Sequence, residues 1–507
     1  MRIVSTPLAP KVSLPAPRPC GADVHLFEAV VGAAGVAASL ERLREPGAVV
    51  VTTGQQPGLF TGPLYTVFKA LSAVALAREL EALWQRPVVP VFWLANDDHD
   101  FAESNHAAWF AGDGSLRQCV LRERPADAPM LPMYREMLGE EIGPVLAQLA
   151  ADLDGASAKD DVIAWLARHY RADVTIGAAY GGALAELLAP YGVVCLDASH
   201  RALKERAAPL LLEALSKSAS MEAPLVTLAA ELAARRADPG VAVGDGATLV
   251  FIEGAQGRDR LVRTPDGYVA RRSGERFTDA ELAAIAASEP ERLSPNVLLR
   301  PVVESSLLPT VAYVAGPGEL RYFALTPPVY QALGVSRQLP VPRWSGLIVE
   351  PRVDRVLAKF GIDLDELLQT EGAAEARIIR DQLPGEVTGP LARLRASLEA
   401  EYTALATGAA TVDPTLEKSV LGSRGQALRG LEDVEKKVLQ HLKKRRETEL
   451  GQVARARVAV RPGGQPQERV VTIGTFLGRL GPGLMDDLLA EIAAWYARTL
   501  EAPVRAS

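Results

Sequence analysis

The segment VVVTTGQQPGLFTGPLY, Val49 to Tyr65, decides the fold of this chain. Its apolar, β-branched beginning is typical of a buried strand, and its glycine- and proline-rich middle is typical of a tight loop. A helical pattern follows at once, from Leu64 to Leu83. A strand, a glycine loop and a helix in this order place backbone N–H groups and a helix N-terminus around an anion. The segment therefore predicts an α/β fold with an anion site beyond its first core strand.

Small and polar residues concentrate in that loop. It contains neither the Gly-Lys-Ser/Thr of a Walker A motif nor a GxGxxG pattern. A plain strand–helix turn is the alternative interpretation, but the density of Gly, Gln and Thr favours a ligand site. The residues predicted to bind substrate or an anion here are Thr53, Gly54, Gln55, Gln56, Gly58, Thr61 and Gly62.

The composition is that of an ordinary soluble globular protein and argues against several classes. Of the 507 residues, 48% are hydrophobic and 23% charged, and the formal net charge is −7. A mildly acidic chain argues against a broad surface for nucleic acid or anionic membrane, so we expect neither partner. The three cysteines, Cys20, Cys119 and Cys195, form no CxxC pair, which argues against a disulfide framework and a cysteine-based zinc site. Without a signal-peptide pattern or an apolar stretch of about 20 residues, we expect a cytoplasmic protein.

Strand and helix patterns alternate through most of the chain, which predicts βαβ units around a parallel sheet. Such sheets bind ligands beyond the carboxyl ends of their strands. Pro90 is expected to bend its strand or to mark a sheet edge. The predicted core elements include a helix over 23–44 and strands over 48–53, 87–96, 193–197 and 310–315.

Two stretches interrupt the core pattern, and a third region replaces it. We therefore divide the chain into seven consecutive segments. They are a first core part (1–106), an insertion (107–175), a second core part (176–236), a hairpin-rich insertion (237–293), a third core part (294–385), an antiparallel helical coiled coil (386–458) and a C-terminal segment that packs on the core (459–507).

The coiled coil is predicted from its spacing of apolar residues. Leu391, Leu394 and Leu398 recur in steps of three and four, and a longer helical pattern covers 415–457 after a break. Two antiparallel helices with a narrow apolar seam make a helical hairpin or coiled coil. Because such an arm buries little by itself, we expect it to pair with a second copy of the chain.

Acidic and histidine residues gather in NDDHDFAESNH, Asn96 to His106, directly after the second core strand. His99 lies between Asp98 and Asp100, and such a histidine can act as an acid or base near neutral pH. The cluster can also hold a divalent metal, or its carboxylates can bind a substrate amine. A helix N-cap followed by a charged turn is the alternative without a ligand.

A third segment with candidate binding residues is SPNVLLRPVVESSLLPTVAYVAGPGE, residues 294–319. Arg300 suits a carboxylate or phosphate contact. Gly316 and Gly318 follow the apolar run 310–315 and make another turn at a strand end, for which a simple turn is the alternative.

Three further residues are weaker candidates. Lys69 is expected to lie too deep in the first helix to reach a ligand. Arg343 and Trp344 are expected to lie in a surface loop.

With these segments in hand, the chain resembles the bacillithiol synthase family, the cysteine-adding enzymes of bacillithiol biosynthesis. The motifs that carry the resemblance span essentially the whole chain, whereas the Glu-Ser-Ser stretch at 304–306 differs from the family pattern. They are TGQQPGLFTGPLYT, PVFWLANDDHDFAESNH, SPNVLLRPVV with LLPTVAYVAGPGE, and, more loosely, QPQERVVTIGTFLGRLG at 465–481.

The resemblance implies a Rossmann-like core similar to nucleotidylyltransferases and class I aminoacyl-tRNA synthetases. It implies that the two insertions are connecting peptides and that the C-terminal coiled coil makes a homodimer. The implied reaction joins the carboxylate of cysteine to the glucosamine amine of glucosaminyl-malate, which forms an amide in the last step of the pathway. An amine does not displace hydroxide from a carboxylate at neutral pH, so the carboxylate must be activated.

Activation by a nucleotide is the natural hypothesis for this fold. ATP or ADP with Mg is therefore the expected cofactor, and no tightly bound metal is expected. The HxGH and KMSKS signatures of class I adenylating enzymes are absent, which leaves the activating chemistry open.

The working assignment makes His99, with Asp98 and Asp100, the catalytic group that takes a proton from the attacking amine. Asn96 and His106 are expected to orient substrate, and Arg300 to neutralise a carboxylate. The glycine loop binds a malate carboxylate or a phosphate.

Two other functions stay open at this point. A metal-dependent hydrolase would use Asp98, His99, Asp100 and His106. A non-catalytic nucleotide-binding accessory protein would dimerise through its helical arm.

Overall fold

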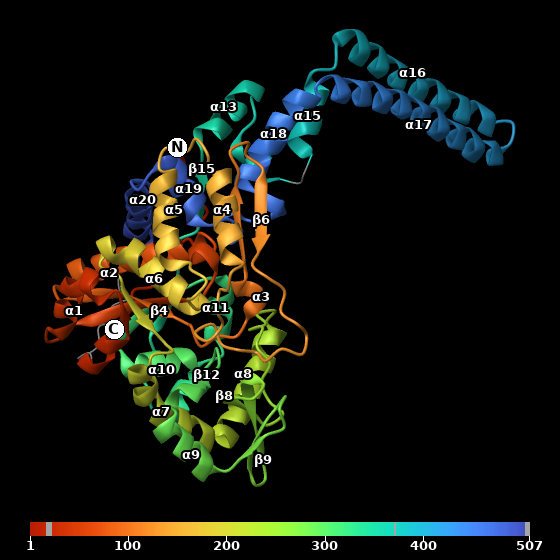
Figure 1. The fold of residues 1–507 in the computed structure, drawn as a ribbon. Helices are drawn as coiled ribbons and strands as arrows, with labels where there is room; N and C mark the ends of the chain where they lie inside the picture. The colour runs from red at the N-terminus through yellow and green to blue at the C-terminus, as the bar shows by residue number, and fades with distance from the viewer. Residues whose placement is uncertain (17–22, 370–371, 502–507) are drawn as a thin grey trace. The chain divides into compact units, whose positions relative to one another are not determined.

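The computed structural model describes residues 1–16, 23–369 and 372–501 (Figure 1). The described chain forms two compact units. One contains residues 3–348 and the segment from 466 onward, and the other contains residues 1–2 and 349–465. Cys20 lies outside the described residues, and none of the described helices is long and apolar enough to cross a membrane.

The larger unit is built on a six-stranded sheet in the order β14-β13-β3-β4-β7-β2. All neighbours are parallel except β2, which pairs antiparallel with β7 at the edge. The strands are β2 (Val30–Val31), β3 (Val49–Gln55), β4 (Val88–Leu94), β7 (Val194–Asp197), β13 (Thr310–Ala315) and β14 (Leu339–Pro342). The predicted parallel-sheet core is confirmed.

The order of the strands identifies the place where a ligand is expected. From β3 the chain first adds β4 and β7 on one side, and later adds β13 and β14 on the other. The direction of winding therefore reverses between β3 and β13. In doubly wound sheets, ligands bind outside the carboxyl ends of the strands at this switch point.

Helices cover the sheet and close the unit. The buried helix α2 packs against β3, β4 and the C-terminal helix α20. The helices of this core are α1 (Ala37–Arg44), α2 (Tyr65–Trp84), α6 (Ile176–Leu188), α7 (Arg201–Ser216), α8 (Ser218–Ala234), α10 (Arg300–Leu307), α11 (Pro317–Phe323), α12 (Pro327–Leu333), α19 (Ile473–Leu480) and α20 (Leu484–Thr499).

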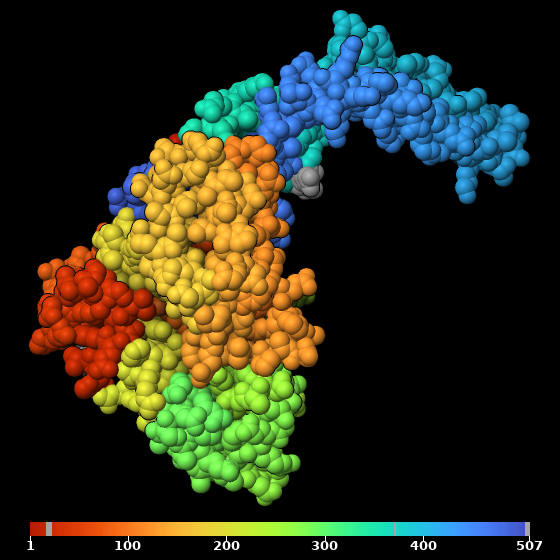
Figure 2. All heavy atoms as spheres, in the orientation of Figure 1, coloured from red at the N-terminus to blue at the C-terminus, as the bar shows by residue number. Residues whose placement is uncertain are grey.

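Two groups of elements lie between the core strands. The first, between β4 and α6, contains α3 (Phe101–Ser104), β5 (His106–Phe110), β6 (Leu116–Val120), α4 (Ile142–Asp152) and α5 (Lys159–His169). The second is an antiparallel sheet in the order β11-β10-β9-β8-β12. Figure 1 shows β8, β9 and β12 with α9 in a green lobe, which is also seen in Figure 2. Its elements are β8 (Ala247–Gly254), β9 (Gly257–Thr264), β10 (Gly267–Ala270), β11 (Arg276–Phe277), α9 (Asp279–Ser288) and β12 (Leu293–Pro295).

One local prediction was wrong, and one of the two expectations for Pro90 is excluded. Residues 23–44 do not form one helix, because Val30 and Val31 pair with β7 and Gly32 turns the chain in a left-handed conformation (φ 66°). Pro90 does not mark an edge, because β4 lies between β3 and β7. The pairing of β4 with β7 begins only at Val91, so Pro90 forfeits no ladder bond to that neighbour.

The smaller unit consists of helices. Figure 1 shows α16 and α17 side by side, and Arg395 of α16 lies 3.5 Å from Glu435 of α17. The coiled coil is confirmed. The helices are α13 (Pro351–Phe360), α14 (Leu364–Leu368), α15 (Ala373–Asp381), α16 (Gly385–Ala410), α17 (Pro414–Arg445) and α18 (Glu447–Val460).

The boundary between the units differs from the predicted division of the chain. Residues 349–385 were assigned to the third core part, but they group with the helical arm. The reason is that α13 and α14 pack against α18, where Lys359 Nζ donates to Gln452 Oε1 at 2.9 Å. β1 (Arg2–Ser5) and β15 (Gly346–Val349) form a separate two-stranded sheet.

A buried ion pair ties the C-terminal segment to the core. Arg343 Nη2 and Nη1 lie 2.6 and 2.9 Å from the two carboxylate oxygens of Glu468, and both side chains are buried. Glu468 Oε1 also accepts a hydrogen bond from Ser345 Oγ at 2.9 Å. Removal of one member of such a pair leaves the other charge buried without compensation.

We expect Glu468→Ala to destabilise the larger unit by about 3–5 kcal/mol, because Arg343 stays buried without its partner. Urea unfolding followed by tryptophan fluorescence measures the loss. Glu491→Ala is the matched control, since Glu491 is partly exposed and its nearest cation, Arg498, lies 3.8 Å away. A control shift as large as that of Glu468→Ala would contradict this assignment.

Candidate functional site

A cleft of about 580 Å³ opens at the switch point of the sheet. Gly54 and Gln55 at the end of β3 lie on one side, and Gly316 and Gly318, after β13, lie on the other. Its charged side chains are five cations and three carboxylates. They are Lys69, Arg300, Arg321, Arg343 and Arg469, and Asp98, Glu103 and Glu319.

Lys69 is the most buried cation of the cleft, and although it lies more than a turn into α2 it lines the cleft wall. The first turns of α2 lie beside the end of β3, so the ammonium reaches the cleft wall. Its Nζ lies 2.7 Å from Glu319 Oε2, donates to the Gly54 carbonyl, and lies 3.2 Å from Gln55 Oε1. Burial lowers the pKa of Lys69. Burial by itself would raise the pKa of Glu319, but Lys69 and the Gly316 N–H hold it below its usual value.

Arg300 lines the cleft from the first turn of α10. Its Nη1 donates to Glu304 Oε2 at 2.9 Å, and its guanidinium lies 4.7 Å from the centre of the Tyr313 ring. Glu304 is fully buried and also accepts a hydrogen bond from the Thr52 hydroxyl. Burial raises the pKa of Glu304 to about 6. Glu304 therefore orients Arg300 from below the cleft and does not itself face it.

Arg343 and Trp344 do not lie in a surface loop, as the sequence suggested. Both are buried, Arg343 beside Glu468 and Trp344 against Phe68 at a ring distance of 4.9 Å. Arg343 lines the cleft.

The glycine loop serves two purposes. Gly54, Gln55 and Gln56 line the cleft, where a Cβ at Gly54 would lie 2.8 Å from the Trp93 carbonyl oxygen. Thr53 instead donates to the Val314 carbonyl at 2.8 Å.

The later loop residues face the protein. The Thr61 N–H donates to Tyr170 Oη at 2.8 Å, and Gly62 turns the chain at φ 72° against Gly58. The Leu64 N–H, at the start of α2, donates to the Val471 carbonyl at 2.9 Å. Thr53, Gly58, Thr61 and Gly62 thus shape the loop, and only its first part reaches the cleft.

Of the acidic segment Asn96 to His106, likewise, only some residues line the cleft. Asp98 and Glu103 line the cleft, and Gln56 donates to Glu103. Asp100 is the N-cap of α3 and accepts from the Glu103 N–H at 3.1 Å. Burial and the charges of Asp100 and Asp98 raise the pKa of Glu103.

The two residues expected to orient substrate bond to the protein instead. Asn96 is buried and donates to Asp197 Oδ1 at 2.9 Å. His106 is exposed, and its Nδ1 lies 2.9 Å from the Ala102 carbonyl oxygen. Neither residue lines the cleft.

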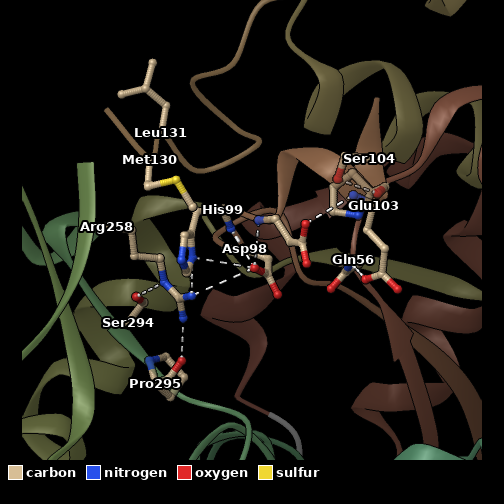
Figure 3. Close-up of polar contacts among 12 residues, drawn as sticks. Gln56, Asp98, His99, Glu103, Ser104, Met130, Leu131, Arg258, Ser294 and Pro295 are labelled. Atoms are coloured by element: carbon tan, nitrogen blue, oxygen red, sulfur yellow. Dashed lines mark hydrogen bonds and ion pairs between the residues drawn. The ribbon is translucent and has the colours of Figure 1, made fainter. Parts of the chain in front are cut away.

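His99 faces an arginine that lies far away in the sequence (Figure 3). Its Nδ1 lies 3.0 Å from Arg258 Nη1 and 3.7 Å from Asp98 Oδ1. Burial lowers the pKa of His99 to about 4, with Arg258 acting in the same direction and Asp98 opposing. A guanidinium only donates, so Nδ1 is the acceptor and Nε2 carries the proton. His99 then presents an N–H donor, which does not support its assignment as the general base.

The cluster is not arranged as a metal site. Among the described residues, no group of three or more histidine, cysteine, aspartate and glutamate side chains could hold a metal ion. The hydrolase hypothesis needs Asp98, His99, Asp100 and His106 to converge. The structure instead gives Asp100 and His106 local backbone partners.

Sequence reasoning missed Arg258 and Arg260 of β9. A smaller chamber of about 180 Å³ adjoins the cleft, and both arginines line it together with His99. Residues two apart in a strand point to the same face, so the RDR spacing was the available signal.

These features define a Rossmann-like α/β protein that has a charged cleft at its switch point and carries a helical coiled coil. Residues 26–344 match the family model described as the N-terminal Rossmann-like domain of bacillithiol biosynthesis BshC. Residues 346–495 match the model of its C-terminal coiled-coil domain. The chain therefore belongs to the BshC family.

Curated relatives cover most of the chain. A protein of Koribacter versatilis is 34% identical over 459 residues, which are 89% of this chain and 83% of the relative. One of Solibacter usitatus is 32% identical over 443 residues, 87% and 82% of the two chains. One of Prosthecochloris aestuarii is 30% identical over 468 residues, 90% and 83%. Each carries the name "Putative cysteine ligase BshC".

We expect the His99 ring to stay neutral when the solution is acidified from pH 7 to pH 5. Its folded pKa of about 4 lies below the usual 6.5, so His99 favours the folded state most above pH 6.5 and this contribution is lost as the pH falls towards 4. NMR of ¹³C-labelled histidine measures the titration, and His99→Gln assigns the signal among the six histidines. A His99 signal that titrates near pH 6.5 would show that the ring is free of Arg258.

Proposed function

We propose that the protein is a ligase of bacillithiol biosynthesis that joins cysteine to glucosaminyl-malate by an amide bond. The names of the relatives support the ligase class and the pathway. The observation that carries the proposal is the cation-rich cleft at the switch point, because malate contributes two carboxylates to the larger substrate.

The rim of the cleft is suited to capture an anion. Arg321 and Arg469 are exposed and line the cleft, and no ion pair with a described residue engages either guanidinium. Deeper in the cleft, Lys69 is already paired with Glu319, and Arg300 with Glu304. We infer that the rim arginines bind incoming carboxylate or phosphate groups, while the buried pairs fix the shape of the cleft.

The cysteine carboxylate must lose an oxygen when the amide forms. ATP with Mg²⁺ is the proposed activator and would supply the phosphoryl or adenylyl group that makes this oxygen a leaving group. Arg321 and Arg469, which form no ion pair with a described residue, fit the charge of a polyphosphate. The attacking amine must also lose a proton, and the carboxylate of Glu103 is the proposed acceptor in place of His99.

Glu103 suits this role for two reasons. It lines the cleft, and its raised pKa makes it a stronger base than an ordinary carboxylate. The hydrogen bond from Gln56 holds the carboxylate in position. Glu103 is thus a catalytic residue in this proposal, whereas Asp100 acts on it through the cap of α3.

The coiled coil is proposed to pair two copies of the chain. Apolar side chains are exposed along both of its helices, among them Leu394, Leu405, Leu416 and Val434. A second coiled coil that covers them would bury this surface. A homodimer in the cytoplasm is therefore the proposed working form.

The direct test is an assay of the purified full chain with cysteine, glucosaminyl-malate, ATP and Mg²⁺, analysed by mass spectrometry. We expect bacillithiol together with stoichiometric AMP or ADP, and the nucleotide product identifies the activating chemistry. Folded protein that binds nucleotide but makes no product would favour the accessory-protein alternative over the ligase.

We expect Glu103→Gln to lower kcat by about 100-fold and to change the KM for glucosaminyl-malate little, because the amide keeps the shape but cannot accept the proton. Initial rates in the same assay measure both constants. Glu123→Gln, at an exposed glutamate, is the control and should keep the wild-type rate. Equal rates for the Glu103 and Glu123 variants would exclude Glu103 as the base.

A further inference from the structure

The chamber beside the cleft contains an arginine, Arg260, that has no ion-pair partner among the described residues. Arg260 lies 5.4 Å from the centre of the Phe251 ring, and no described carboxylate forms an ion pair with its guanidinium. Burial and the neighbouring charges of Arg271 and Arg258 lower its pKa. A partly buried cation beside two like charges is costly for the fold, which indicates that an anion completes the site.

Arg258 adds a second cation that neutral atoms hold in place (Figure 3). Its Nε donates to Ser294 Oγ at 2.8 Å, and its Nη2 donates to the Pro295 carbonyl at 2.8 Å. Its guanidinium lies 4.1 Å from the centre of the Phe251 ring, and Asp98 Oδ1 is 4.0 Å from Nη1. The guanidinium is thus fixed in orientation by neutral atoms, with Asp98 as an ion-pair partner at 4.0 Å.

The chamber is also lined by two carboxylates, of which Asp97 is paired with Lys204 at 2.9 Å. Asp98 lines both the chamber and the cleft. Its Oδ1 accepts the N–H groups of His99 and Asp100 at 2.6 and 3.2 Å. The second oxygen makes no hydrogen bond with the described residues, so it can accept from a ligand.

Arg300 connects the two spaces because it too lines both. A carboxylate bound among Arg258, Arg260 and Arg300 would be reached from the cleft on the Arg300 side. The second carboxylate oxygen of Asp98 therefore suits the ammonium group of a zwitterionic ligand, and the arginines suit its carboxylate.

We propose that this chamber binds the amino-acid substrate, with its carboxylate at Arg260 and Arg258 and its ammonium group at Asp98. The assignment rests on the proposed ligase function for the identity of the amino acid, cysteine. The volumes agree with it, since cysteine is much smaller than glucosaminyl-malate and the chamber, at about 180 Å³, is much smaller than the cleft. The Phe251 ring, Pro295 and Val297 supply an apolar wall for the side chain.

The test is calorimetric binding of three small thiols to the full chain, which requires no turnover. Cysteine carries both charged groups, cysteamine lacks the carboxylate, and 3-mercaptopropionate lacks the ammonium group. We expect Arg260→Ala to weaken cysteine and 3-mercaptopropionate by about 10- to 100-fold and to leave cysteamine unchanged. Asp98→Asn should weaken cysteine and cysteamine and leave 3-mercaptopropionate unchanged.

Controls separate this site from the fold and from the proposed reaction. Arg276→Ala removes an exposed arginine of the same sheet that does not line the chamber and should keep wild-type cysteine binding. If Arg260→Ala proves unstable, Arg260→Lys is measured in its place. This variant keeps the charge and should retain part of the wild-type affinity for cysteine. If the Arg260 and Asp98 variants lose affinity for different thiols as expected, the binding site in the chamber is supported even when the ligase assay gives no product. The binding site and the ligase function can therefore fail separately.

Three results would overturn the inference. The first is wild-type protein that binds no cysteine, with or without ATP. The second is equal cysteine affinity in wild type and Arg260→Ala. The third is an Arg260→Ala variant that loses affinity for free malate but not for cysteine, which would assign the chamber to the malate end of the other substrate.

Discussion

The ion pair between the buried Lys69 and the partly buried Glu319 joins the two halves of the sheet at the point where their winding reverses. Lys69 comes from the helix after β3, and Glu319 from the helix after β13. Burial of two charges costs several kcal/mol each, and only close geometry with additional hydrogen bonds compensates for it. In this pair the Gly54 carbonyl, the Gly316 N–H and the Tyr313 hydroxyl supply those bonds. The pair therefore fixes the spacing of the two strand ends between which the cleft opens.

A second layer of paired charges lies behind the first. Arg300 bonds to Glu304, which in turn bonds to Thr52 of β3, and Arg343 bonds to Glu468 of the C-terminal segment. These pairs neutralise most of the buried charge, so the groups left for a ligand lie at the rim and in the side chamber. Charge pairing by the fold thus decides which cations can bind substrate.

The sequence was sufficient for features that depend on local order along the chain. Gly54, Gln55 and Gly316 were predicted to lie at strand ends, and the parallel order of the strands brings them to one cleft. It was insufficient where a distant partner determines the role. His99 was interpreted from its neighbours Asp98 and Asp100, yet Arg258, 159 positions away, occupies its Nδ1. No periodicity in the sequence records such a contact.

The burial of Arg343 could not be predicted from its sequence neighbours for the same reason. An arginine directly after a Pro-Val-Pro stretch is typical of an exposed loop, and only a carboxylate 125 positions later compensates for its burial. Arg260 differs from Arg343 because no described carboxylate forms an ion pair with it, and Arg258 differs because Asp98 approaches it only to 4.0 Å. Both guanidiniums lie against the Phe251 ring, whose face attracts cations and offsets part of their mutual repulsion. An anion that enters the chamber relieves the remaining repulsion. The arginines of the chamber therefore keep an electrostatic attraction for a ligand, whereas carboxylates of the fold neutralise the other buried cations of the site.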